Sequence, residues 1–298
     1  MKNIPRRHHW IPQFYLEYFA VTESIGTESP EIWCFQRGDT DQAEFKTGIR
    51  AVAAKNDLYT KKIEGSKDTT LESEFADIEG LISQIWKTLA YGSFNFNKSD
   101  SYKKGFSPFL GLMLVRHPIQ FSDWEKYHKK IVNLLDEVKK ESNKMTIEIS
   151  DSELELNFEG YDLYRNQSTT DLKNSFLDNI KGNSMHLVEQ LLKKRWSILH
   201  CDKPAFVTSD NPVLILNDKN KGINRPNTKI VFPISPQRAF YIDDLIDEPH
   251  WQYYPITESH VHELNYLQWV SDIKFMFSPR SIPDVLTEIL KVSDRYSG

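Results

Sequence analysis

The hydrophobic pattern of the chain changes from helical to alternating near residue 196, and this change constrains the fold more than any other feature. Before it, residues 69–90 place apolar side chains at helical spacing, and residues 122–144 and 170–195 are amphipathic, with Ser122 as an expected N-cap. After it come short β-forming runs such as WSILHC, KIVFPIS and AFYID, separated by turn residues. Helices followed by strands, without regular alternation, indicate an α+β protein.

The same pattern predicts how the elements are organised. We expect a single domain over residues 1–298, with a helical central part at about 70–195 and a β-rich part at about 196–280. The connections between these segments are short, which favours one domain over two. The expected architecture is a helical layer packed on a mainly antiparallel sheet.

Composition excludes several classes of protein. The 298 residues carry a net charge of −5, which argues against a generic basic binder of nucleic acid or lipid but leaves room for a local basic patch. Cys34 and Cys201 have neither metal nor redox spacing. No apolar run is long enough to span a bilayer, so no membrane partner is expected. The start of the chain is not signal-like, and we expect a cytoplasmic protein.

The stretch RRHHWIPQFYLEYF, residues 6–19, is unusually rich in histidine and aromatic residues for a chain end. Neighbours on a strand or helix point in different directions, so we expect one of His8 and His9 to face a cleft and the other to face the core. Gln13 lies four residues beyond His9 and can share its face on a helix. A histidine titrates near neutral pH, which suits it to acid–base catalysis. The alternative is a hydrogen-bonded histidine that only supports packing.

A second unusual stretch, FVTSDNPVLIL, breaks a β-like run with polar and turn-forming residues. This break places Ser209, Asp210 and Asn211 at a sheet end, where functional residues often lie. An ordinary hairpin or β-bulge is the alternative explanation. Polar groups within apolar runs are best tolerated when they satisfy one another, so we expect the N-terminal segment to pack against Asp210.

Two further polar residues stand out. Arg116 ends an apolar helix, and a buried arginine needs a partner, which can be a carboxylate or a bound phosphate. Asn265 lies within a predicted helix, where it is weaker evidence for a site. The chain contains no phosphate-binding loop, no dinucleotide fingerprint, no HExxH zinc motif and no GxSxG elbow.

Taken together, these motifs resemble a bacterial family of unknown function whose members open with HHxxPQFYLRxF and carry an SDNP motif. The matching stretches HHWIPQFYLEYF, AAKNDLYT, LESEFADIEG, LVRHP, FVTSDNPV, FPISP and HELNYLQWV follow in the family's order over nearly the whole chain. Glu17 stands where the family usually has arginine. The resemblance implies a link to phage-defence loci. It also singles out the polar residues His8, His9, Gln13, Arg116, Ser209, Asp210, Asn211 and Asn265.

Three hypotheses account for these residues. The first is a phosphodiester hydrolase, a nuclease-like defence toxin, in which a histidine is the general acid or base and Arg116 stabilises phosphate. In it, Asp210 orients the imidazole or holds a divalent metal, Gln13 and Asn211 complete the catalytic cluster, and Ser209 and Asn265 contact substrate. The second is a binding module that senses a phage protein or a small ligand. The third is a purely structural network. Cofactor and oligomeric state are left open.

Overall fold

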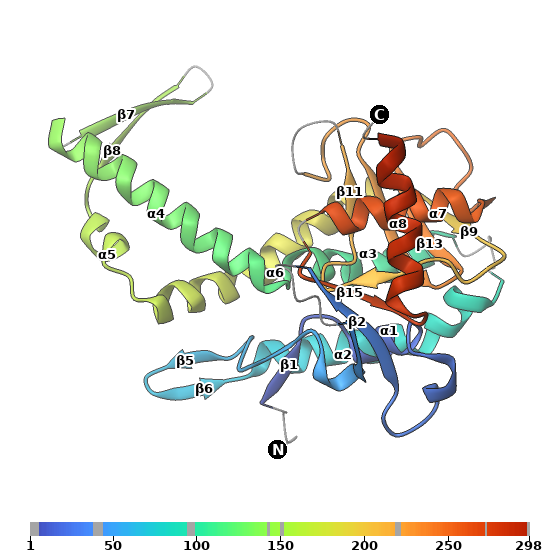
Figure 1. Ribbon diagram of the computed structural model, residues 1–298. Coiled ribbons are helices and arrows are strands. Elements are labelled where there is room, and N and C mark those ends of the chain that lie inside the picture. The colour runs from blue at the N-terminus through green and yellow to red at the C-terminus, as the bar shows by residue number, and fades with distance from the viewer. Residues whose placement is uncertain are drawn as a thin grey trace.

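The computed structural model describes residues 6–37, 44–93, 99–141, 144–149, 152–217, 222–271 and 273–296. Within them the chain forms a five-stranded sheet, a four-stranded sheet, three two-stranded ribbons and eight α-helices (Figure 1). Strand pairs are antiparallel except that of β14 with β9. The expectation of an α+β fold with helices on a mainly antiparallel sheet is confirmed.

The five-stranded sheet has the order β11-β12-β13-β9-β14 and is built from the β-rich last third of the chain. Its strands are β9 (Arg195–His200), β11 (Leu214–Leu216), β12 (Lys229–Ser235), β13 (Arg238–Asp243) and β14 (Tyr253–Pro255). The helices α2 (Thr70–Tyr91) and α3 (Ser99–Val115) lie against it. Trp86 of α2 is fully buried, packs edge-on to Phe232, and donates its indole N–H to the carbonyl oxygen of Ile234 at 3.1 Å. One aromatic side chain therefore anchors the helical layer to the sheet.

The four-stranded sheet has the order β10-β15-β2-β3 and joins the two ends of the chain. Its strands are β2 (Glu31–Gln36), β3 (Glu44–Gly48), β10 (Thr208–Ser209) and β15 (Phe275–Ser278). The helices α7 (Glu258–Val270) and α8 (Ile282–Tyr296) cover it through a cluster that includes Phe35, Val207 and Val285. Residues far apart in the sequence thus share one small core.

The N-terminal segment is tied down at several points. Strand β1 (Arg7–His9) pairs with β4 (Ala54–Asn56), and the short helix α1 (Gln13–Glu17) follows it. Tyr15 of α1 is fully buried, and its hydroxyl lies 2.6 Å from Thr208 Oγ1 and donates to the carbonyl of Pro233 at 3.0 Å. The indole of Trp10 donates to the carbonyl oxygen of Asp210 at 3.0 Å. The segment therefore packs against the strand and turn that carry Asp210.

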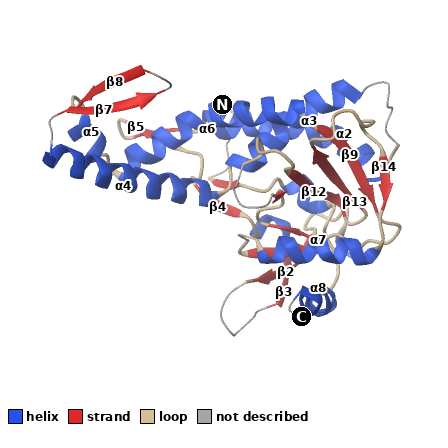
Figure 2. Cartoon of the chain, turned by 90° about the horizontal axis from the view of Figure 1, so that it is seen from above, coloured by secondary structure: helices blue, strands red, loops and turns tan. Residues whose placement is uncertain are grey.

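An arm projects from this body in both views (Figures 1 and 2). It contains α4 (Pro118–Glu141), β7 (Lys144–Ile149), β8 (Ser152–Asn157), α5 (Tyr161–Arg165) and the first turns of α6 (Thr169–Lys193). The helix α6 returns to the body, where it lies beside α3. A Cβ on Gly111 would meet the backbone oxygen of Ser184 at 3.0 Å, so glycine permits this close approach.

Two local expectations about the arm are wrong. The helix predicted to start after Ser122 begins at Pro118, because proline suits the first helical position, where no N–H is needed. The same expected helix also ends before Lys144, the first residue of the β7–β8 hairpin, since MTIEI and ELELN alternate with a period of two residues. None of the helices in the described ranges combines the length and apolarity needed to cross a bilayer.

Candidate functional site

The two adjacent histidines of β1 point in opposite directions, because successive side chains alternate across a strand. His8 is 1% exposed, stacks on the ring of Tyr59, and its Nδ1 accepts the backbone N–H of Tyr59 at 3.1 Å. His9 is only partly buried and faces an open cavity. Of the pair, His9 is therefore placed to meet a ligand, while His8 supports the loop at Tyr59.

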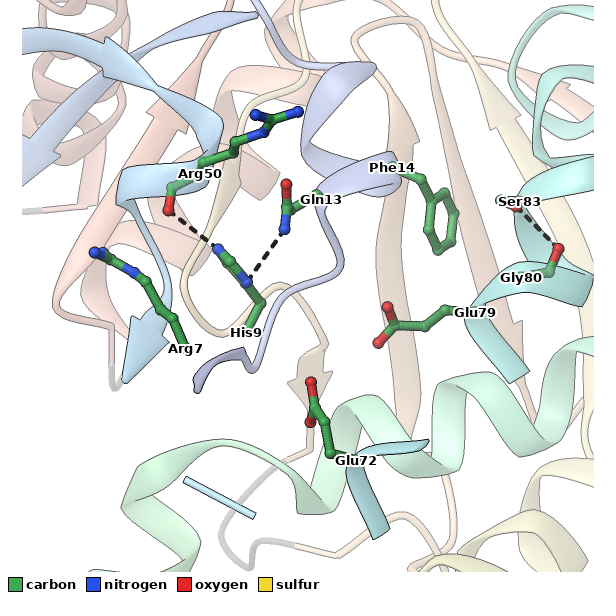
Figure 3. A pocket seen from close by; sticks show the side chains of 9 residues that line it. All are labelled: Arg7, His9, Gln13, Phe14, Arg50, Glu72, Glu79, Gly80 and Ser83. Carbon is green, nitrogen blue, oxygen red and sulfur yellow. Dashed lines mark hydrogen bonds between the residues drawn. The ribbon is translucent and has the colours of Figure 1, made fainter. Parts of the chain in front are cut away.

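The cavity beside His9 has a volume of about 580 Å³ and a lining that mixes charged, polar and apolar groups (Figure 3). Three parts of the chain form it: β1 with α1, the short 3₁₀ helix Ile49–Ala51, and one face of α2. Its lining residues are Arg7, His9, Gln13, Phe14, Arg50, Glu72, Glu79, Gly80 and Ser83. Two arginines, an imidazole and two carboxyl groups thus face the same space.

The environment of His9 keeps its imidazole neutral. The ring lies between the carbonyl oxygen of Arg50, 3.2 Å from Nε2, and the amide nitrogen of Gln13, 3.3 Å from Nδ1. Because a carbonyl can only accept, Nε2 carries the proton and Nδ1 keeps its lone pair. Burial lowers the pKa of His9 below 6.5, and the positive charges of Arg7 and Arg116 act in the same direction. At neutral pH this ring is a base.

The environment of Glu72 raises the pKa of its carboxyl group, whereas the environment of His9 lowers the pKa of its imidazole. Burial raises the pKa of the Glu72 carboxyl to about 7, against the charge of Arg116, and the nearby carboxylate of Glu79 raises it further. The two glutamates are seven residues apart on α2 and so lie on the same face of the helix, directed toward the cavity (Figure 3). Near pH 7 a substantial fraction of Glu72 therefore carries a proton that it can donate.

Arg116 lies behind this cavity rather than in its lining. The residue is 3% exposed, and its Nη1 donates to Glu79 Oε1 at 2.7 Å while Nη2 donates to the carbonyl oxygen of His9 at 2.5 Å. The Tyr59 hydroxyl donates to the Arg116 carbonyl at 2.7 Å. The guanidinium thus spans α2 and β1, and of the two partners that the sequence left open the structure contains the carboxylate, that of Glu79.

Asp210 lies in a neighbouring cavity of about 420 Å³. The cavity is lined by Trp10, His117, Pro118, Ile119, Asp210, Ile273, Lys274 and Phe275. Asp210 Oδ1 accepts the backbone N–H groups of Lys274 and Phe275 at 3.0 and 3.1 Å, and Oδ2 lies 3.8 Å from His117 Nε2. One carboxylate oxygen therefore fixes the start of β15, and the other lies nearest to an imidazole.

The remaining motif residues bind neighbouring backbone and side chains. Asn265 is 2% exposed; its amide oxygen accepts the N–H of Val207 at 3.3 Å and its nitrogen donates to the carbonyl of Ala205 at 2.9 Å. Ser209 Oγ accepts from Gln268 Nε2 at 2.9 Å and from the backbone N–H of Asn211 at 3.1 Å. These contacts join α7 to β10 and to the segment just before it. Ser209, Asn211 and Asn265 line neither of the two cavities.

The structure therefore brings His9 and Gln13 together, with Arg116 behind them, and places Asp210 in the adjoining cavity. Sequence reasoning did not select Arg7, Arg50, Glu72, Glu79 or His117. A signal existed for the two glutamates, since they lie seven residues apart, and so on one face, of an amphipathic helix. Within the described ranges, no three His, Cys, Asp or Glu side chains are grouped so that they could hold a metal ion.

A comparison with protein families matches residues 7–277 to the family described as "Protein of unknown function (DUF4238)". The match covers most of the chain, and the protein belongs to this family. Neither the curated proteins nor the solved structures contain a match to the chain.

Because the Arg116 guanidinium bonds to both Glu79 and the His9 carbonyl, its replacement should lower the free energy of unfolding. Lysine can serve either Glu79 or the His9 carbonyl but not both, so Arg116→Lys should lower the free energy of unfolding by about 1–3 kcal/mol. Arg116→Ala should cost about 3–5 kcal/mol, because it leaves a charge unpaired. Urea denaturation measures both. Arg165→Lys, at an exposed ion pair with Asp136, is the matched control. An unchanged unfolding midpoint for Arg116→Lys would contradict this role.

Proposed function

We propose that this protein hydrolyses phosphodiester bonds by general acid–base catalysis, with His9 as the base and Glu72 as the acid. One arrangement carries the proposal: an imidazole and a carboxyl group line the same cavity, and their pKa values are shifted in opposite directions, so that a neutral imidazole and a protonated carboxyl coexist near pH 7. Oppositely shifted titratable groups in one cavity are typical of acid–base pairs.

The roles follow from the protonation states. Nδ1 of His9 takes a proton from the attacking hydroxyl, which is water or a sugar hydroxyl of the substrate, once the Gln13 amide gives up its contact with that nitrogen. Glu72 gives its proton to the departing oxygen. The imidazole then holds one extra proton and the carboxylate lacks one, and exchange with solvent restores both groups. Glu79, already bound by Arg116, keeps its charge close to Glu72 and favours the protonated form of that acid.

The phosphate group would lie near the arginines at the cavity wall. Arg50 is exposed, and its guanidinium has no ion-pair partner in the described part of the chain. Arg7 uses Nη2 to reach the carbonyl of Ala51 at 2.7 Å, which fixes its side chain and leaves its other N–H groups for an anion. Guanidinium groups fit phosphate oxygens in a bidentate manner, and they stabilise the charge that develops during phosphoryl transfer.

The biological role that we attach to this chemistry is defence against phage. It is supported by the resemblance of the motifs to a family found in phage-defence loci, and a nuclease acting in the cytoplasm would serve as the toxic effector. In such a system a phage-encoded trigger would release the activity, and nucleic acid would be the substrate.

A pH–rate profile tests the acid–base assignment. Activity should fall below pH 6.5 as His9 becomes protonated, and it should fall again above about pH 7 as Glu72 loses its proton, giving a bell-shaped curve. Glu72→Gln should lower kcat by about 10²–10⁴-fold and remove the alkaline limb. The measurement is cleavage of labelled RNA and DNA with and without EDTA.

The control for this experiment is Glu74→Gln, which changes a more exposed glutamate of the same helix that pairs with Lys181. This variant should keep the wild-type rate and profile. A rate that continues to rise through pH 8, or full activity of Glu72→Gln, would refute the assignment.

A second candidate function is a binding module for a small ligand, and the cavity at Asp210 favours it. This cavity combines aromatic walls from Trp10 and Phe275 with one carboxylate oxygen that no backbone N–H occupies. Few polar groups in an otherwise apolar cavity are typical of ligand sites.

Asp210→Asn separates the two functions. The amide oxygen can still accept both backbone N–H groups, so the fold should be kept, while the second oxygen becomes an N–H donor. If the protein is the proposed hydrolase, this variant cleaves nucleic acid at the wild-type rate, because Asp210 is outside the His9 cavity. The binding module would instead be supported if the wild type does not cleave nucleic acid and cells that carry Asp210→Asn lose the defence against phage.

A further inference from the structure

A group of cations lies next to the His9 cavity in a chain whose net charge is negative. We define the cation cluster as Arg6, Lys55, Lys62, Lys67 and Lys173. Arg6 immediately precedes β1, and Lys55 lies on β4. Lys62 and Lys67 lie on the hairpin of β5 (Lys61–Ile63) and β6 (Ser66–Asp68), and Lys173 lies near the start of α6. Four separate segments thus contribute positive charge to one region.

The contacts at Asp57 show that these cations are close together. Lys67 Nζ lies 2.9 Å from both carboxylate oxygens of Asp57, Arg6 Nε lies 3.3 Å from one of them, and Lys173 Nζ donates to the Asp57 carbonyl at 2.7 Å. Two cations therefore share one carboxylate, and a third binds the backbone carbonyl of the same residue. Lys55 and Lys62 are exposed, and neither makes an ion pair with any described residue.

The electrostatics of Lys173 are consistent with an excess of positive charge. Its pKa is lowered by burial first, and then by the charges of Lys55, Lys62 and Lys67, with Asp57 acting in the opposite direction. Like charges held this close repel one another, and a bound anion would relieve the repulsion.

The backbone holds these charges in place. The Asn174 side chain of α6 accepts the backbone N–H of Lys62 at 3.1 Å and donates to its carbonyl at 2.7 Å, and Lys61 forms an ion pair with Asp178 of the same helix. The hairpin is thus docked on α6. Cations on a fixed backbone lose less conformational freedom when they bind a ligand.

The cluster lies close to the His9 cavity along β1, but Arg6 and Lys55 are on the face of the β1–β4 ribbon that carries His8, opposite to His9. Arg6 precedes Arg7, which lines the cavity, and Lys55 pairs with His8 across the β1–β4 ladder. A strand rises by about 3.3 Å per residue, so the distance from the cluster to His9 is comparable to the spacing of a few phosphates along a nucleic acid.

We infer that the cation cluster binds the phosphate backbone of a nucleic acid strand on one side of the bond held between His9 and Glu72. This inference rests on the proposed function, and it names a polymer rather than a mononucleotide as the substrate. A chain of regularly spaced phosphates can pass from these cations over the edge of the β1–β4 ribbon to the recessed cavity, whereas a flat anionic membrane cannot reach that cavity.

The double variant Lys55→Glu/Lys62→Glu tests the inference. Both side chains are exposed and make no ion pair in the described structure, so the fold should be unaffected. The control Lys193→Glu/Lys291→Glu makes the same change in net charge at exposed lysines on the last turn of α6 and on α8. Binding is measured by fluorescence anisotropy with short labelled strands of RNA and DNA, single and double, in the Glu72→Gln background across a range of salt concentrations.

The cluster variant should bind at least about tenfold more weakly than the control, and the slope of log K against log salt should decrease by about 1–2. Equal affinity and equal slope for the two double variants would overturn the inference. So would binding to vesicles of anionic lipid without binding to nucleic acid.

Cleavage of a dinucleotide separates this inference from the catalytic proposal, because so short a substrate does not reach the cluster. In the active protein, Lys55→Glu/Lys62→Glu should raise KM for a long strand and leave dinucleotide cleavage unchanged. Salt-sensitive binding that depends on the cluster, without any cleavage, would refute the catalytic assignment and support the cluster. If long strands are cleaved equally well by the wild type and by Lys55→Glu/Lys62→Glu, the catalytic assignment is supported and the role of the cation cluster is refuted.

Discussion

The buried guanidinium of Arg116 is the contact on which the His9 cavity depends. It joins Glu79 of α2 to the backbone of His9 in β1, two elements that no ladder of backbone hydrogen bonds connects. By neutralising Glu79 it lets a second carboxyl, Glu72, lie on the same helix face at a tolerable electrostatic cost. Its charge also opposes protonation of His9. The charge of Arg116 thus favours the neutral form of His9 but opposes protonation of Glu72, whose raised pKa comes from burial and from the charge of Glu79.

The aromatic N-terminal segment explains why such a cavity can exist near the start of the chain. A terminus usually frays, but Tyr15 reaches two separate strands with its hydroxyl and Trp10 reaches the turn at Asp210. These long-range bonds hold β1 and α1 against the body, so the side chains of His9 and Gln13 have fixed neighbours. A mobile segment would leave the imidazole in water, with an ordinary pKa and no defined partner.

Local periodicity predicted the fold class because it depends on neighbouring residues, and the change near residue 196 marks the start of β9. It could not predict the proposed acid, because the pKa of Glu72 is raised chiefly by burial, which depends on how the whole chain packs around this helix face. The sequence also could not tell whether a polar motif residue lines a cavity or only supports packing, because both uses depend on contacts between distant segments. The family motifs single out Asn265 together with His9, yet the Asn265 amide bonds to the backbone of Ala205 and Val207, and only the folded structure distinguishes the two uses.

The most direct measurement of the central claim is a site-resolved NMR titration of the Glu72 carboxyl carbon and the His9 imidazole in the intact protein, assigned with Glu72→Gln and His9→Gln. We expect Glu72 to titrate near pH 7 and His9 to titrate below its ordinary value of 6.5. Their protonation states would then support an acid and a base in one cavity. A Glu72 pKa near 4.5, together with a His9 pKa at or above 6.5, would contradict the account.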